Sequence, residues 1–215
     1  MKTKFSFSEG RCGGEDGAII VEFALMAPFL VMMVLGVIEY GTLLRNDTTI
    51  TGAVRNSARA GAQGQNLQYG DREALNTLSA SLQSANNIVV NRVVIYRATS
   101  STGTVPANCT SLPMSGSGAG SASDQCNVYN ATQVSTASSG TWTTSTATCS
   151  TGSPAAGGGW DRWWCPNSRR SSLTGSMSPP DYLGVYIDVQ YTPITGLLGS
   201  RSILDRAVNR IEPTV

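Results

Sequence analysis

One long apolar segment lies near the start of the chain. Positions 18–38 have the sequence AIIVEFALMAPFLVMMVLGVI, in which Glu22 is the one charged residue. About 20 apolar residues, at a helical rise of about 1.5 Å each, cross the hydrocarbon core of a bilayer. A secretory signal peptide has a shorter apolar region and a small-residue cleavage site, and the following GVIEYGTLLR contains no clean site of that kind. The pattern therefore predicts a retained membrane-spanning helix over residues 18–40.

The helical pattern continues beyond the apolar segment. Between Ile38 and Pro106 there is no proline, and apolar residues recur at helical spacing at Leu43, Leu44, Ile50, Ala53, Val54, Ala58 and Ala62. This predicts one helix from Ala18 to about Gln63, on the order of 70 Å long. Pro28 removes one backbone hydrogen bond from it, either as a kink or as an ordinary transmembrane proline.

Shorter elements follow this helix. Asp71 is expected to cap a second helix, with Glu73 in its first turn and one apolar face made by Leu75, Leu78 and Leu82. The branched residues of positions 88–97, IVVNRVVIYR, predict a strand. The strict alternation over 183–191 predicts another, with one face formed by Leu183, Val185, Ile187, Val189 and Tyr191.

The last element is ambiguous, because positions 202–211 fit a helix or a strand. Two helices against a small antiparallel sheet would make an α+β domain. The sequence therefore predicts an extracytoplasmic α+β domain over residues 41–215, interrupted by an insertion over 99–181 that is poor in charge and rich in Ser, Thr, Gly and Ala.

The insertion holds four of the five cysteines. Cys109, Cys126, Cys149 and Cys165 all follow the apolar segment, whereas Cys12 precedes it. An even set in a loop-rich region predicts two disulfides in an oxidising compartment, with three pairings open; the alternative is four reduced, buried thiols. No pair has the C-x-x-C spacing of zinc or redox sites, which argues against a metal.

A tryptophan cluster lies at the end of this cysteine region. Trp160, Trp163 and Trp164 belong to the sequence WDRWWC. Two interpretations stay open. The indoles cover a small core in a disulfide-bonded loop, or they form an exposed contact patch for adhesion or for another subunit.

The charged residues exclude most catalytic chemistry. The chain has no histidine, and both lysines, Lys2 and Lys4, lie in the first four residues. Ser-His and Cys-His pairs, histidine metal ligands and phosphate-binding lysines are therefore unavailable in the rest of the chain. The net charge of +1 gives no attraction to nucleic acid. We expect no enzymatic activity, no cofactor, no metal and no nucleic-acid partner.

Glu22 requires an explanation, because a carboxylate within an apolar span costs about 2.5 kcal/mol or more. It lies five positions after Gly17, which ends the polar stretch RCGGEDG. Cleavage after Gly17 would create an α-amino group at Ala18, one helical turn from Glu22. The carboxylate would then have a counter-ion in its own chain or a neighbouring one. The alternative is an uncleaved span with Glu22 near the interface.

These residues resemble a known family. Gly17 followed by AIIVEF resembles the G-x-x-x-x-E-F/Y processing site of type IV prepilins, with Glu22 and Phe23 in the last two positions. The continuation through Pro28 to Glu39-Tyr40-Gly41, and then NSARAGA, is similar over about residues 13–63 to the TadE-like family of tad (tight adherence) pilus proteins. The closing DRAVNRIEP is similar to family C-termini.

The resemblance implies a function and a set of partners. It implies that residues 1–17 form a leader cleaved by prepilin peptidase at the cytoplasmic face, that Ala18 is N-methylated, and that Glu22 and Phe23 act in assembly. It also favours a third strand over 202–211. The partners implied are the peptidase, other pilin subunits, the pilus assembly platform and, before assembly, membrane lipid. The expected protein is a minor pilin-like (pseudopilin) subunit.

The expected location is the bacterial inner or cytoplasmic membrane and later the pilus or cell surface. Lys2, Lys4 and Arg11 favour a cytoplasmic N-terminus, and the four later cysteines place the C-terminal domain outside. The alternative function is a non-polymerising single-span membrane protein whose outer domain binds a ligand or adheres.

Overall fold

The computed structural model describes residues 15–64, 69–111, 125–138, 160–166, 169–170, 179–196 and 199–212. The chain divides into two compact units, Met1–Gly41 and Thr42–Val215. Most of the predicted leader and Cys12 lie outside the described residues, as does Cys149.

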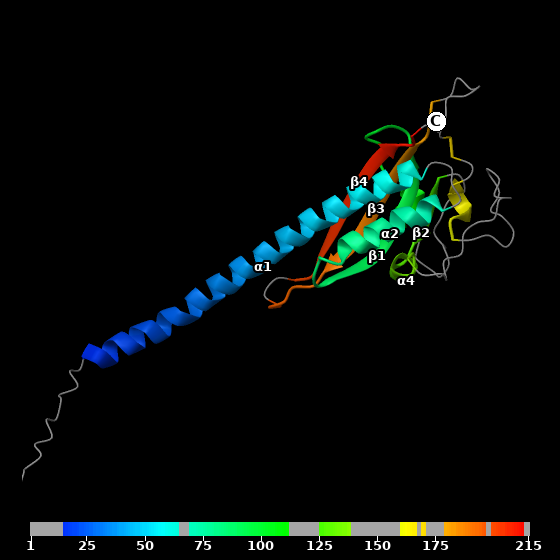
Figure 1. The fold of residues 1–215 in the computed structure, drawn as a ribbon. Coiled ribbons are helices and arrows are strands. Elements are labelled where there is room, and N and C mark those ends of the chain that lie inside the picture. Colours follow the sequence, from blue (N-terminus) through cyan, green and yellow to red (C-terminus); the bar gives the residue numbers. More distant parts are fainter. Residues whose placement is uncertain are drawn as a thin grey trace, which may run out of the picture. The chain divides into compact units, whose positions relative to one another are not determined.

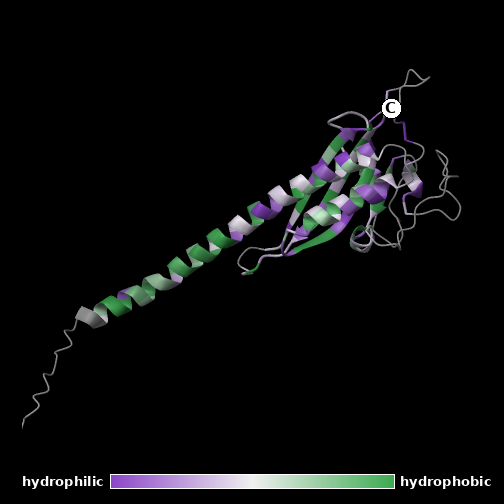
Figure 2. Cartoon of the chain, viewed as in Figure 1, coloured by the Kyte–Doolittle hydropathy of each residue, from purple (hydrophilic) through white to green (hydrophobic). Residues whose placement is uncertain are grey.

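The first unit is the N-terminal part of helix α1, which runs from Glu15 to Gln63 and contains Pro28. The predicted long helix is confirmed, and it begins three residues before Ala18. Figure 2 shows the N-terminal half of α1 as a nearly continuous hydrophobic stretch, followed by a more polar half.

The second unit is an α+β domain, as the sequence predicted. A four-stranded antiparallel sheet has the order β2-β1-β3-β4, with β1 at Ile88–Ala98, β2 at Cys126–Tyr129, β3 at Tyr182–Tyr191 and β4 at Arg201–Arg210. The rest of α1 and helix α2, Gly70–Leu82, lie across one face of this sheet (Figure 1). The Ser57 hydroxyl donates to the Ala74 carbonyl at 2.8 Å and joins the two helices.

The main core lies between these helices and the sheet. It contains Leu75, Leu78 and Leu82 of α2 and every member of the predicted inward face of β3. Residues 201–210 are a strand, which resolves the ambiguous segment. The predicted apolar stripe on α1 is wrong at one position. Leu44 is 48% exposed, whereas Ile50 and Val54 are fully buried.

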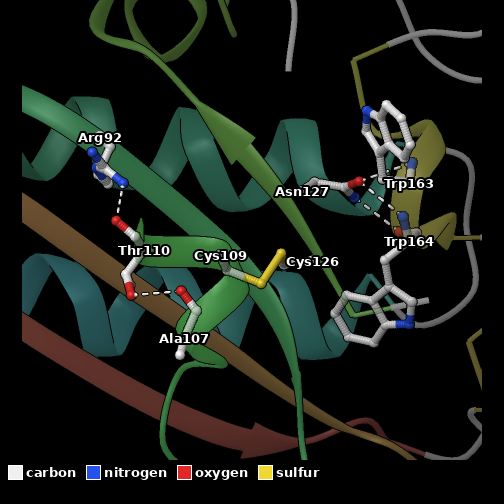
Figure 3. The surroundings of a disulfide bond; sticks show 8 residues. All are labelled: Arg92, Ala107, Cys109, Thr110, Cys126, Asn127, Trp163 and Trp164. Atoms are coloured by element: carbon white, nitrogen blue, oxygen red, sulfur yellow. Dashed lines mark hydrogen bonds between the residues drawn. A yellow bond between two sulfur atoms is a disulfide. The ribbon is translucent and has the colours of Figure 1, made fainter. Parts of the chain in front are cut away.

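The insertion contributes structure that the sequence patterns did not predict. It supplies α3 (Ala107–Ser111), β2, α4 (Ala131–Ser135) and the 3-10 turn η1 (Arg162–Trp164). A second hydrophobic cluster forms across α3, β1 and β2, made of Val94, Tyr96, Ala98, Cys109, Cys126 and Val128. The disulfide Cys109–Cys126 joins α3 to β2 (Figure 3), and Cys165 is also disulfide-bonded. The expected disulfide-containing insertion is therefore confirmed.

A glycine in β3 makes room for an aromatic ring of the second cluster. Gly184 pairs with Tyr96 of β1, and the Tyr96 hydroxyl donates to the Gly103 carbonyl at 3.1 Å. A Cβ on residue 184 would lie 2.2 Å from the Tyr96 Cζ atom. Because Tyr96 is fully buried, its ring has no free space into which to move.

We expect Gly184→Ala to destabilise the second unit by about 2–3 kcal/mol, the cost of overpacking a closed core. Gly52→Ala is the matched control, because nothing lies within 4 Å of its Cβ position in α1. An alanine there should stabilise the helix by about 0.5–1 kcal/mol. Urea denaturation of both variants in detergent measures the difference, and equal stabilities would contradict the packing argument.

Candidate functional site: the N-terminal helix and the tryptophan loop

The apolar side chains of the first unit are not covered by the described part of the chain. Most of the large ones between Ile19 and Ile38 are 52–71% exposed, and these are Ile19, Ile20, Val21, Phe23, Leu25, Met26, Phe29, Leu30, Val31, Met32, Met33, Val34, Val37 and Ile38. An apolar surface of this length, interrupted by the one charge of Glu22, requires lipid or other protein chains around it. Among the described residues, α1 is the one helix that is long and apolar enough to cross a membrane, which fits a single-pass membrane protein.

The predicted processing residues lie at the beginning of this helix. Gly17 lies in the first turn of α1, and no side chain packs around its Cβ position. Ala18 and Glu22 are four positions apart, so they lie on the same side of the helix, and both are exposed. Phe23 is 67% exposed. The helix therefore brings Ala18 and Glu22 to neighbouring positions on one side of α1.

The tryptophan loop, residues 160–166, occupies a different environment. Trp164 is 2% exposed and belongs to the main core, and the partly buried Trp160 packs against that core. Trp163 is partly buried, with the Arg162 guanidinium 5.3 Å from its ring centroid. Trp164 therefore contributes to the core. Within this loop, Trp160 and Trp163 are the tryptophans that keep some solvent-exposed surface.

Asn127 of β2 holds the backbone of this loop. Its Oδ1 atom accepts hydrogen bonds from the backbone N–H groups of Trp163, at 3.1 Å, and Trp164, at 2.9 Å. Its Nδ2 atom donates to the Trp164 carbonyl at 2.9 Å. Figure 3 shows the Asn127 side chain directed from the strand toward both tryptophans. The disulfide-linked strand β2 therefore also positions the tryptophan loop.

Asp71 is the centre of a buried polar network and not a helix cap. The N-cap of α2 is Tyr69, and Asp71 lies inside the first turn. Its Oδ1 atom is 2.6 Å from Arg169 Nη1, and both side chains are fully buried. Its Oδ2 atom accepts from Asn127 Nδ2 at 2.8 Å and from the Tyr129 hydroxyl at 2.7 Å. The prediction of a cap was wrong because three distant polar groups converge on this carboxylate.

The same network holds Arg169 and Tyr129. The Arg169 guanidinium lies 4.0 Å from the Trp164 ring centroid, and its Nη2 atom donates to the Trp164 carbonyl at 2.9 Å. Burial raises the pKa of Tyr129 well above its ordinary value, and the Asp71 carboxylate raises this pKa further. The phenol therefore remains a proton donor well above neutral pH. All these groups are closed off from solvent, so the network serves to fasten the insertion to α2 and β2.

Sequence reasoning missed this network because its members are far apart in the chain. Asp71 and Asn127 are separated by 56 positions, and no spacing rule links them. One signal was present, since the charge-poor insertion regains charges at Asp161, Arg162, Arg169 and Arg170. A buried aspartate in α2 needs a cation of this kind.

A second ion-pair site borders a hollow of about 580 Å³. Asp181 pairs with Arg97 at 3.0 Å and with Arg170 at 3.2 Å, and it also accepts from the Arg170 backbone N–H at 2.9 Å. Both arginines are partly exposed. Because these pairs saturate the carboxylate, Asp181 acts as a structural link. No group of three or more potential metal-ligating His, Cys, Asp or Glu residues occurs within the described ranges.

The N-terminal part of the chain matches a family model. Residues 17–59 match the model of the family described as TadE-like protein. This confirms the resemblance noted in the sequence, and the match begins at Gly17. No curated protein and no solved structure matches the chain.

We expect Arg169→Met to lower the free energy of unfolding by about 3–5 kcal/mol, because it leaves Asp71 buried without its counter-ion. Arg170→Met is the matched control. It removes a 45% exposed guanidinium while Arg97 keeps its pair with Asp181, so its cost should be about 0–1 kcal/mol. Urea denaturation measures both variants. Equal losses would show that burial of the Asp71–Arg169 pair has no special weight.

Proposed function

We propose that this chain is a minor pilin-like (pseudopilin) subunit that takes part in tad-type pilus assembly after prepilin peptidase cleaves it behind Gly17. One observation carries the proposal. The TadE-like match begins at Gly17, the residue at which the polar N-terminal stretch gives way to the apolar helix containing Glu22.

The proposed first stage takes place in the membrane. Residues 18–40 span the bilayer with lipid around their exposed apolar side chains, and the leader lies on the cytoplasmic side. Prepilin peptidase cuts between Gly17 and Ala18 and leaves an α-amino group, which is then N-methylated. Lipid at this stage and the peptidase are the first two partners.

The proposed second stage is transfer of α1 from lipid into the core of the fibre, through the assembly platform. Lipid tails are as apolar as leucine, so this transfer yields no hydrophobic free energy by itself. Side-chain packing and polar pairing must favour it. The exposed Glu22 and the new amine of Ala18 are the opposite charges available, within one chain or between neighbours, and Phe23 packs beside them.

The second unit would remain outside the membrane as the solvent-facing part of the subunit. Its disulfide, Cys109–Cys126, suits an oxidising compartment. The buried groups around Asp71 are paired with one another, which supports a structural role and not an enzymatic one. The partly exposed Trp160 and Trp163 are then candidates for subunit contact.

Intact-mass measurement tests the processing step. In a host that carries the peptidase, the purified protein should begin at Ala18, with the mass of one methyl group added. Gly17→Leu should block cleavage, because a bulky side chain beside the Gly17–Ala18 bond would hinder the approach of the peptidase. Gly36→Ala, a change at a second open helical position, is the control and should be cleaved normally. A mature chain that keeps residues 1–17 supports the non-polymerising membrane protein instead.

We expect Glu22→Ala to be cleaved normally and to reduce incorporation into pili by about tenfold or more, as expected if one charge pair of about 1.4 kcal/mol or more is lost at each subunit contact. The exposed Glu73 of α2 supplies the control, Glu73→Ala. Incorporation is measured by immunoblotting sheared pilus fractions against the membrane fraction. Normal incorporation of the Glu22 variant would remove the proposed role of this carboxylate.

A further inference from the structure

Exposed apolar residues of the second unit are concentrated at one end. Among its described residues, five large hydrophobic side chains are 48–61% exposed, and they are Leu44, Tyr69, Val89, Ile194 and Leu204. Four of the five lie close to the point where α1 enters this unit, as the hydrogen bonds and the strand register establish.

Three segments of the chain lie side by side at that end. The Asn46 side chain of α1 donates to the Asn86 carbonyl at 2.8 Å and accepts from the Asn86 backbone N–H at 3.2 Å. The neighbouring Asn87 carbonyl accepts from the Thr192 N–H at 2.9 Å. These bonds place the first turns of α1 in this unit, the α2–β1 connection and the β3–β4 turn side by side. We call this group the entry end.

The four exposed residues border these contacts. Leu44 precedes Asn46 by two positions, and Ile194 follows Thr192 by two, in a turn that contains Gly196 at a φ of +70°. Val89 pairs with Gln190, and Leu204 pairs with Asp188 on the other side of β3. Since Gln190 and Asp188 lie on the same face of β3, Val89 and Leu204 lie on one sheet face, the one opposite to α1 and α2.

Tyr69 is the exception and lies at the opposite end. It is the N-cap of α2, whereas Asn86 follows the other end of that helix. The 13 residues of α2 separate the two ends by about 20 Å. Tyr69 is therefore an exposed aromatic residue of the same unit at a site remote from the entry end.

The position of the entry end in the chain indicates what covers it. Thr42 begins this unit immediately after the apolar segment. Asn46 follows Tyr40 by six positions, and even a fully extended chain spans only about 20 Å over that length. If residues 18–40 span a bilayer, the entry end therefore lies at or close to its headgroup region.

Two exposed arginines at the entry end are compatible with contact with lipid headgroups. Arg45 and Arg201 are exposed beside the apolar residues, and arginines at a membrane surface hold lipid phosphates while their stems cover apolar area. Asp47 is the exposed acidic residue nearest to them in α1. Scattered apolar tips with flanking cations are typical of interfacial contact with lipid.

We propose that the entry end of the second unit rests on the lipid headgroups and inserts Ile194 of the β3–β4 turn into the interface before assembly. This second contact, besides the membrane span, would restrict the tilt of the domain on the membrane. The proposal rests on the membrane-resident stage of the proposed function, and it requires neither cleavage after Gly17 nor fibre formation.

Fluorescence quenching by brominated lipids tests this contact in the full chain, reconstituted in phosphatidylcholine–phosphatidylglycerol vesicles. Ile194→Trp is compared with Tyr69→Trp, and the signal of the unaltered protein is subtracted because the chain has four tryptophans. Tryptophan is favoured at a bilayer interface, so we expect about twofold or greater quenching at position 194 and almost none at position 69. Equal quenching at the two positions would overturn the proposal.

A second measurement uses the unaltered chain, so that the added tryptophan cannot create the contact. Amide hydrogen exchange at residues 194–196 should be slower in lipid nanodiscs than in a thin belt of amphipathic polymer, with no change at residues 69–73. If exchange slows only after other pilus subunits are added, the entry end contacts protein and not lipid, and the proposal is contradicted. A chain that fails to float with vesicles contradicts the proposed membrane stage itself, whereas a floating chain without protection contradicts only this inference.

Discussion

The structure depends on one constraint, which is an apolar helical surface that the described part of the chain does not cover. Between Ile19 and Ile38, α1 exposes apolar side chains on all sides. A bilayer or neighbouring helices must supply the contacts. Within that surface, Glu22 is a charge that needs a counter-ion, and cleavage after Gly17 would create one. In the proposed function, two positions that are five residues apart would thus link membrane residence, processing and assembly.

The second unit has the opposite property, because most of its large apolar side chains in the described ranges are buried in its own two hydrophobic clusters. The amphipathic half of α1 and α2 cover one face of the sheet, and the insertion covers part of the other. Several interactions hold the insertion, and two of them differ in physical kind. The disulfide Cys109–Cys126 joins α3 to β2, and the buried pair Asp71–Arg169 fastens the tryptophan loop. Since a buried ion pair adds little net stability, we interpret this pair as one that selects a unique position for the loop.

Periodicity identified the elements whose residues contact one core. The alternation in β3 and the leucines of α2 each mark a single buried face, so that local spacing was sufficient. Local spacing did not reveal β2, because all four residues from Cys126 to Tyr129 are buried and show no alternation. It also misplaced Leu44, which has the helical spacing of the stripe but remains exposed at the entry end, and it assigned Asp71 to a cap.

By itself, the sequence determined the long apolar helix, the carboxylate within it, the α+β class and the lack of histidine. These are properties of composition and short-range periodicity, and the resemblance from Gly17 onward depends on the same short-range order. The tertiary structure alone decided that Asn127, Tyr129 and Arg169 converge on Asp71, that Trp164 is buried, and that four exposed apolar residues lie toward one end of the second unit. Those arrangements join residues tens of positions apart, and long-range packing brings them together without a signal in local spacing.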